Sequence, residues 1–264
     1  MLNRRELGLG GLLGAWVGPC FGAKPLRFAL SQSWGPPFLE RQGSRVLGGV
    51  LPDLMTGMAG EVGRTPEFVL LPPARVDEAL EDGGVDLHCL LAPQWVSIAV
   101  DESRWSVAVL VLRDVLVAAP GYASPGGQPS TNSPTVPMRG EVVGTVRGYR
   151  YPKLEADFAT GRLQREDALD QWAVLEKLAR GRSSLGVVNE FTFAAFQKRR
   201  AEAGLRVLRV VDQVSTHCLL GAKPSLPAEQ LRAGIRRYVE SGRLAEALEG
   251  YQLPAETPRS PGRR

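Results

Sequence analysis

The segment from Leu26 to Leu91 alternates between β-favouring and helix-favouring stretches, and this alternation limits the possible folds more than any other feature of the chain. The expected order is strand Leu26–Leu30, helix Leu51–Val62, strand Glu67–Leu71, helix Ala74–Leu80 and strand Val85–Leu91. Both helices show apolar residues at helical spacing and end at glycine. Two successive strand–helix–strand units predict a parallel sheet covered by helices, with the apolar third strand buried inside it.

The loop after the first strand is a candidate ligand-binding segment. It contains Gly35, Pro36 and Pro37, which prevent regular structure. Open α/β sheets bind their ligands at the carboxyl ends of strands, beside loops of this kind. The start of the chain therefore predicts one compact lobe with a potential binding edge.

A second α/β set follows a long β-favouring run, Val107–Ala119, which is interrupted only by Arg113 and Asp114. Residues 120–140 are rich in glycine, proline and serine and are expected to form a loop. The elements expected next are strand Val142–Val146, a helix from Tyr151, helix Ala168–Ala179, strand Leu185–Val188, helix Thr192–Ala203, strand Leu205–Val211, a return crossing Val214–Ala222 and terminal helices up to Tyr251.

Two similar halves joined by two extended crossings indicate a hinged, two-lobed molecule. Lobe one is predicted to comprise residues 24–115 and 215–253, and lobe two residues 116–214.

Residues 1–23 have the features of a secretory signal peptide. Arg4 and Arg5 precede a short, glycine-rich apolar core that is too short to span a membrane, and small residues follow it. The paired arginines favour the twin-arginine route, with a Sec signal as the alternative. We expect cleavage after Gly22 or Ala23 and a periplasmic protein.

The net charge of +4 is concentrated near the ends of the chain. Removal of the signal leaves +3, and the tail, residues 254–264, carries three arginines and one glutamate. The body therefore has no basic face for nucleic acid. The tail is proline-rich and is expected to be disordered. No later apolar segment approaches the roughly 20 residues that a membrane span requires, which argues against a channel or permease.

Five segments occur in a characteristic order along the chain. They are the strand and aromatic-Pro-Phe turn at residues 26–38, the glycine-led helix at 49–63 with Asp53, Gly84-Val85-Asp86-Leu87, Val143-Gly144-Thr145-Val146-Arg147-Gly148, and Leu178-Ala179-Arg180-Gly181-Arg182. In these segments, from Leu26 to about Tyr251, the chain resembles the family 3 extracellular solute-binding proteins, which serve polar amino-acid ABC importers.

The resemblance implies an α/β, two-lobed type II periplasmic binding fold, in which each lobe is a mainly parallel sheet flanked by helices and two hinge strands join the lobes. It also implies a monomer that closes on a small polar solute, which can be carboxylate-bearing, and delivers it to a membrane permease. A membrane sensor is the alternative partner. No cofactor, metal or catalytic residue is expected.

The sequence departs from the family where amino acids are bound. Members that bind amino acids carry an arginine after the third strand, which pairs with the ligand carboxylate. Here Gln94 and Trp95 occupy that turn. The family's ammonium-binding aspartate corresponds to Asn189, with Glu190 beside it. Both departures argue against a standard amino acid as the ligand.

Other residues provide a partial replacement. Arg147 or Arg150 could supply a cation from lobe two, in a turn where the family binds an anion. The alternative is that both arginines are solvated turn residues. The complete set of candidate ligand-binding residues is Ser31, Trp34, Phe38, Arg75, Gln94, Trp95, Arg147, Tyr149, Arg150, Tyr151, Asn189 and Glu190. The aromatic members are expected to form walls of the site, whereas Trp172 has the spacing of a packing residue.

Two His-Cys dipeptides, His88-Cys89 and His217-Cys218, lie on predicted strands. Neighbouring strand residues point to opposite faces, so four ligands for one zinc ion are not expected. We expect two buried free cysteines, with a disulfide as the alternative in an oxidising compartment. Lipid attachment at Cys20 is disfavoured because Pro19 precedes it.

Enzymatic motifs are missing from the sequence. It has no Gly-x-Ser-x-Gly elbow, no phosphate-binding loop and no His-Glu-x-x-His metal motif. A few relatives of this fold are dehydratases or lyase-like. Glu190 could act as a general acid or base if it faced a cleft. We therefore expect a binding protein, with a dehydratase-like enzyme as a further alternative.

Overall fold

The computed structural model describes residues 23–96, 98–123 and 140–251. The predicted signal up to Gly22, the predicted disordered tail and most of the predicted loop at 120–140 lie outside these residues. Within the described ranges, no helix is both long enough and apolar enough to cross a membrane.

The helices and strands follow the predicted alternation. The first half contains β1 (Leu26–Ser31), β2 (Glu40–Gln42), β3 (Arg45–Gly48), α1 (Val50–Glu61), β4 (Pro66–Leu71), α2 (Pro73–Asp82), β5 (Leu87–Leu91) and β6 (Leu110–Ala118). The second half contains β7 (Glu141–Val146), α3 (Glu155–Ala159), β8 (Leu163–Ala168), α4 (Gln171–Ala179), β9 (Leu185–Asn189), α5 (Glu190–Arg199), β10 (Arg206–Leu220), α6 (Ala228–Glu240) and α7 (Arg243–Gly250).

Three details differ from the sequence-based expectation. The strand at 205–211 and the return crossing at 214–222 form one continuous strand, β10. The short hairpin β2–β3 lies in the stretch between the first strand and the first helix, where no strand was expected. Strand β8 was also not predicted, because its polar sequence is that of a sheet edge, where charged side chains face water. Ala168 therefore ends a strand, and α4 begins after Asp170, which accepts a hydrogen bond from the Ala173 N–H.

The strands form one sheet in the order β4-β1-β5-β10-β6-β9-β7-β8. Strands β4, β1 and β5 are mutually parallel, as are β9, β7 and β8. Between these two groups, β10 and β6 pair antiparallel with each other and with their outer neighbours. The fold is therefore α/β with two parallel groups, as the resemblance implies.

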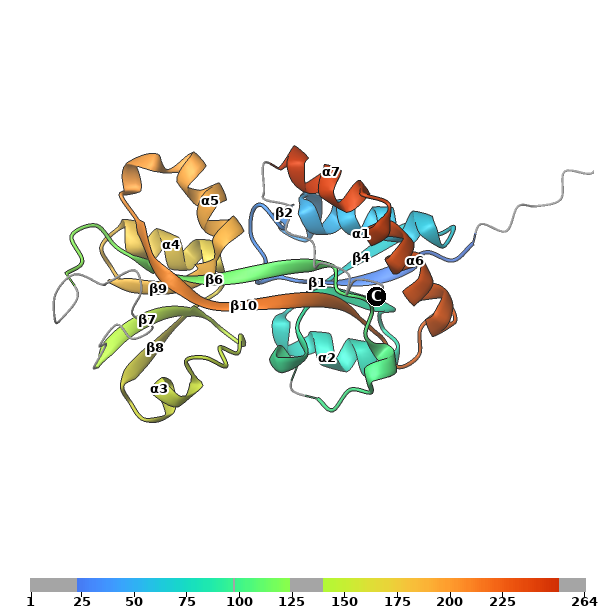
Figure 1. The fold of residues 1–264 in the computed structure, drawn as a ribbon, viewed down its shortest axis with the longest axis horizontal. Helices are drawn as coiled ribbons and strands as arrows, with labels where there is room; N and C mark the ends of the chain where they lie inside the picture. The colour runs from blue at the N-terminus through green and yellow to red at the C-terminus, as the bar shows by residue number, and fades with distance from the viewer. Residues whose placement is uncertain (1–22, 97, 124–139, 252–264) are drawn as a thin grey trace, which may run out of the picture.

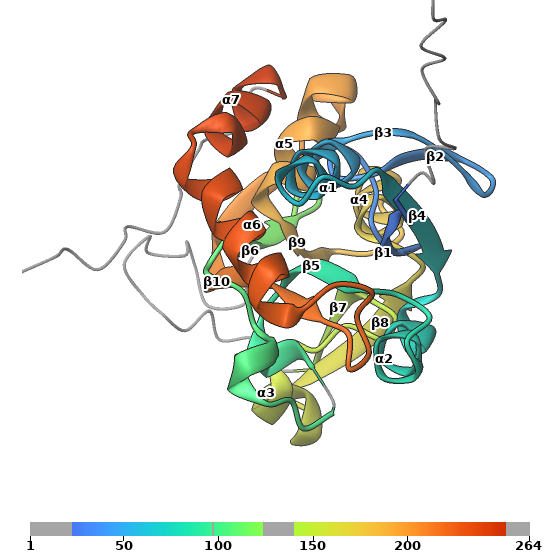
Figure 2. The ribbon, with the colours of Figure 1, turned by 90° about the vertical axis from the view of Figure 1, so that its right-hand side faces the viewer.

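Figure 1 shows the two groups side by side along the long axis, with β6 and β10 running between them. We call β1, β4, β5 and helices α1, α2, α6 and α7 lobe one, and β7–β9 with α3–α5 lobe two. In lobe one, α1 and α2 lie on opposite sides of β1, as Figure 2 shows from the end of the molecule. The predicted boundaries at 115/116 and 214/215 fall within the two crossing strands.

The hydrophobic core changes along β6. Leu110 and Leu112 pack in the core of lobe one, whereas Val115 and Val117 pack in a core of lobe two beneath α4 and α5. The intervening residues, Arg113 and Asp114, belong to neither core. The charged interruption of the apolar run therefore marks the passage from one lobe to the other.

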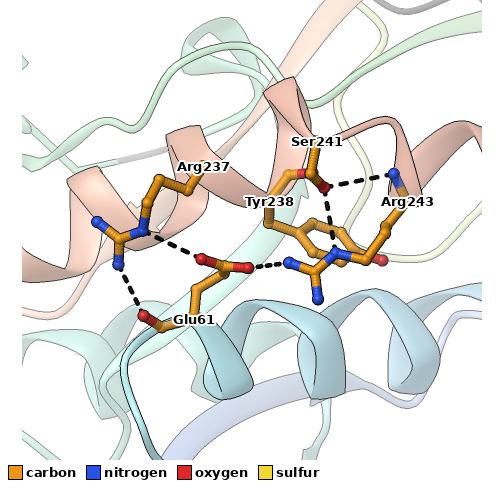
Figure 3. Close-up of polar contacts among 5 residues, drawn as sticks. All are labelled: Glu61, Arg237, Tyr238, Ser241 and Arg243. Carbon is orange, nitrogen blue, oxygen red and sulfur yellow. Dashed lines mark hydrogen bonds and ion pairs between the residues drawn. The ribbon is translucent and has the colours of Figure 1, made fainter.

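Helix α1 is attached to the C-terminal helices by a polar cluster (Figure 3). Glu61 accepts hydrogen bonds from Arg237 on α6, at 3.0 Å, and from Arg243 on α7. The Arg243 guanidinium also lies 5.2 Å from the centre of the Tyr238 ring. The same ring packs so closely on α1 that a Cβ atom added at Gly57 would lie 2.1 Å from it.

Cys89 and Cys218 form a disulfide, so the expectation of two free cysteines is wrong. Strands β5 and β10 pair antiparallel with these residues directly opposite each other, 3.9 Å apart at Cα. Sequence periodicity could not reveal this register. His88 points elsewhere and its Nδ1 contacts the Ala29 carbonyl at 3.1 Å. Among the residues that the structure describes, no three His, Cys, Asp or Glu side chains are grouped to hold a metal ion.

Candidate functional site: a cavity between the lobes

A cavity of about 300 Å³ lies where the two lobes meet the crossing strands. Lobe one contributes Ser31 at the end of β1, the first turn of α2, and residues around the end of β5. Lobe two contributes Gln171, Asn189 and the turn at residues 148–150. The cavity is therefore located at the carboxyl ends of parallel strands from both lobes, as the predicted fold requires.

Half of the candidate residues line this cavity. They are Ser31, Trp34, Trp95, Tyr149, Arg150 and Asn189. The three aromatic residues come from three separate segments of the chain, which only the tertiary structure brings together. Trp34, Trp95 and Arg150 line this same cavity.

The two buried aromatic candidates outside the cavity have packing roles. Phe38 is completely buried, with its ring 4.6 Å from Trp34 and 5.9 Å from Phe191. It supports the wall that Trp34 forms instead of contacting the cavity. Tyr151 is also buried, and its hydroxyl accepts a hydrogen bond from the Val146 N–H at 3.0 Å.

The four other candidates outside the cavity are polar. Arg75 is exposed and pairs with Glu78 at 2.8 Å, and Gln94 and Arg147 are exposed as well. Glu190 pairs with Arg113 at 3.2 Å. Of the three candidate arginines, only Arg150 lines the cavity.

The lobes touch each other across the cavity. Ser33, which follows β1, is within 2.7 Å of the Ser31 hydroxyl and donates a hydrogen bond to the Tyr149 hydroxyl at 3.1 Å. Trp34 meets the Tyr149 ring edge-on at 6.5 Å. Arg150 donates to the Val96 carbonyl at 3.4 Å. These contacts connect the two lobes at the mouth of the cavity.

Asn189, which the sequence led us to expect at the position of the family's aspartate, forms hydrogen bonds with neighbouring segments. Its Oδ1 accepts from the Phe191 N–H at 3.0 Å and caps α5. Its Nδ2 donates to the Arg113 carbonyl, and its own N–H donates to Gln171 at 2.6 Å. Asn189 thus orders one wall of the cavity and carries no charge.

Sequence reasoning missed Asp77, His88, Asp114 and Gln171, which also line the cavity. Asp114 had a visible signal, since it interrupts an apolar strand. Side chains alternate along a strand, so Leu112 and Asp114 both face the cavity while Arg113 faces the other way. The significance of this interruption depends on which face of β6 meets the cavity, and that is a tertiary property.

The cavity alters the ionisation of its walls. Burial, together with the charge of Asp212, raises the pKa of Asp114 to about 7. Burial is also the main cause that raises the pKa of Tyr149 above its ordinary value, so its hydroxyl stays protonated. Desolvation lowers the pKa of His88, which favours the neutral ring.

A second, more open cleft of about 800 Å³ is also lined by Trp34. Arg199 and Glu40 form an ion pair of 2.6 Å there, joining α5 to β2. Arg41, Lys177, Arg180 and Arg182 also line this cleft. The Arg199–Glu40 ion pair is therefore a further contact between the two halves of the molecule.

No known family profile matches the chain, and no curated protein matches it either. Solved structures do resemble it. An ancestral arginine-binding protein bound to arginine has a TM-score of 0.68 at 17% identity, covering 86% of this chain and 97% of that chain. The substrate-binding protein of an amino acid ABC transporter has a TM-score of 0.65 at 14% identity, with coverage of 86% and 99%.

A third similar structure is an ancestral amino acid-binding protein described as a precursor of cyclohexadienyl dehydratase, with a TM-score of 0.65 at 15% identity and coverage of 86% and 94%. Each of the three similarities covers 86% of this chain. The chain therefore has the two-lobed fold of family 3 solute-binding proteins.

Proposed function

We propose that this protein is an exported, periplasmic solute-binding protein that captures a small polar solute between its lobes for an ABC importer. The observation that carries the proposal is the cavity whose walls come from both lobes. A solute that contacts Ser31 and Trp34 on one side and Tyr149 on the other gains all its contacts only when the lobes are closed. Such differential contact is what shifts a hinged protein to its closed state.

The crossing strands would act as the hinge. The core changes between Leu112 and Val115, so the backbone at Arg113 and Asp114 can bend without disturbing either core. Closure would bring Tyr149 to Ser33 and Arg150 to Val96. The closed surface would then be recognised by a membrane permease, or by a membrane sensor in the alternative reading.

A dehydratase-like activity is a second candidate, favoured by one observation. Glu190, the acid or base suggested by sequence, is paired with Arg113 and does not line the cavity. Asp114 does line it, and a pKa of about 7 suits a general acid or base. Recovery of a bound solute chemically unchanged after prolonged incubation supports binding alone, whereas loss of water from the solute supports the enzyme.

Thermal-shift screening of amino acids, organic acids, amines and opines tests the proposed function, because a ligand that binds only the folded state raises its apparent stability. Tryptophan fluorescence then reports where the solute binds. Trp34→Phe and Trp95→Phe should each reduce the ligand-induced change. Trp105→Phe is the matched control, since Trp105 packs against His217 and lines neither cleft. A hit that changes neither fluorescence nor the radius of gyration contradicts capture by closure.

A further inference from the structure

Asp114 occupies an unusual place for a carboxylate. It lies on β6 where the strand passes between the lobes, and its side chain lines the cavity beside Leu112. Within the ranges that the structure describes, no hydrogen bond or ion pair satisfies its oxygens. The adjacent cation, Arg113, points to the other face and binds Gln213 at 2.9 Å and Glu190 at 3.2 Å. A half-buried carboxylate without a partner is costly unless a ligand supplies one.

The groups around Asp114 make a positively charged ligand in the cavity still more favourable. Asp212 on β10 lies directly opposite Asp114 in the antiparallel register, and like charges in such a pair are destabilising. Asp77 on α2 also lines the cavity. His88 on β5 is held neutral by burial, and Tyr149 keeps its proton.

One cation, Arg150, also lines the cavity, but it is exposed and donates to the Val96 carbonyl at the mouth. The charged groups of the lining are thus two carboxylates and one rim guanidinium. Trp34, Trp95 and Tyr149 add three aromatic rings to the lining. Carboxylates combined with aromatic walls are the surroundings that stabilise a desolvated organic cation.

We propose that the cavity selects a small organic cation and that its ammonium or guanidinium group pairs with Asp114, with the aromatic rings enclosing the rest. The inference rests on the proposed function and adds the ligand class and the residue that determines it. A cavity of about 300 Å³ limits the ligand to a small molecule. Arg150 at the rim leaves room for a carboxylate on the same ligand, so simple amines and cationic amino acids share the recognised chemistry.

Proton release on ligand binding distinguishes a ligand-binding role of Asp114 from a purely structural one. A carboxyl with a pKa of about 7 is partly protonated in the free protein near neutral pH. A bound cation favours the charged carboxylate and displaces that proton. Binding of a cation at pH 6.5 should therefore release protons, and the apparent affinity should rise as the pH increases through 7.

The experiment is isothermal titration calorimetry at pH 6.5 in two buffers of different ionisation enthalpy. The probes are agmatine, putrescine and choline as cations, arginine and lysine as cationic amino acids, and succinate, glutamate and glucose as anionic or neutral comparisons. The difference in affinity between agmatine and arginine, which carries a carboxylate that agmatine lacks, reports whether the rim binds a carboxylate.

Asp114→Asn should weaken cation binding roughly 10- to 100-fold and abolish the proton release. Asp77→Asn should weaken binding but leave the proton release in place. Glu67→Gln, an equal charge change at an exposed position on β4, should change neither. Thermal stability of Asp114→Asn at pH 8 that equals or exceeds that of the natural protein ensures that the variant is folded.

Undiminished cation binding by Asp114→Asn overturns the inference. Binding of succinate, glutamate or glucose with no binding of any cation also overturns it, while the proposed function stands. If no probe in this panel or in the wider thermal-shift screen binds, both the inference and the proposed function are contradicted.

Discussion

Cys89 on β5 and Cys218 on β10 are joined by a disulfide that closes 129 residues of sequence and is completely buried in lobe one. The bond attaches the returning crossing strand to the strand that lines the cavity. All of lobe two lies within the closed loop, so the second crossing is fixed to lobe one at its far end.

Replacing both cysteines, Cys89→Ser with Cys218→Ser, should lower the free energy of unfolding by about 2–5 kcal/mol, because the unfolded chain regains a long loop's entropy. Urea unfolding of the mature protein measures the loss. The natural protein, unfolded without reductant, should give no labelling by a thiol reagent at these positions. Two labelled thiols there contradict the disulfide.

Gly57→Ala should destabilise the protein by about 1–3 kcal/mol, although alanine favours helices, because its Cβ would lie 2.1 Å from the Tyr238 ring. Gly60→Ala in the same helix is the control. A Cβ at Gly60 meets nothing within 4 Å, so this change should stabilise by about 0.5–1 kcal/mol. Thermal unfolding of both variants gives the comparison, and equal effects of the two changes contradict close packing of α6 on α1.

Tyr149→Phe should shift the protein toward its open form, because the change removes the hydroxyl that accepts a hydrogen bond from Ser33 between the lobes. A loss of about 1 kcal/mol shifts the balance between closed and open forms roughly five-fold. Small-angle scattering of the protein without added solute should show a larger radius of gyration. Ser33→Ala should act in the same direction and the double variant should add little.

The control for this prediction is Tyr122→Phe, since the Tyr122 hydroxyl bonds Glu141 within lobe two. It should leave the scattering curve unchanged. An identical radius of gyration for Tyr149→Phe and the natural protein would show that this contact does not hold the lobes together.

Asp114→Asn should make stability less dependent on pH. The pKa of Asp114 in the folded protein is raised from 3.8 to about 7, so its protonated form stabilises the fold at low pH. That stabilisation is lost as the pH rises from about 4 to 7, by up to about 4 kcal/mol. Urea unfolding at several pH values should show this decline in the natural protein and a flatter curve in the variant.

Asp86 should give the natural protein a pH dependence of stability opposite to that from Asp114, and Asp86→Asn should remove it. Burial raises the pKa of Asp86, but hydrogen bonds from Arg27 and Ser225 outweigh it and lower the pKa overall. This stabilisation is present above about pH 4 and is lost as the pH falls further. The variant should be less stable by roughly 1–3 kcal/mol at neutral pH and should lose the difference in acid. The same unfolding series measures both effects.

The sequence alone determined the parallel lobe at residues 26–91, because apolar strand segments that alternate with amphipathic helical segments bury their apolar faces only as strands covered by helices. It also identified the crossing run at 107–119 and the aromatic residues Trp34 and Trp95. These features are local, and each can be recognised from its own residues and their neighbours.

Only the tertiary structure decided which side chains share the cavity. The register of β5 with β10 paired the cysteines, and the pleat of β6 turned Asp114 toward Tyr149 while turning Arg113 away. Tyr151 was directed into a core, although it lies two residues from Tyr149. Strand β8 was not predicted because its sequence is polar. In each case the outcome depends on contacts between segments far apart in the chain, and local periodicity carries no information about them.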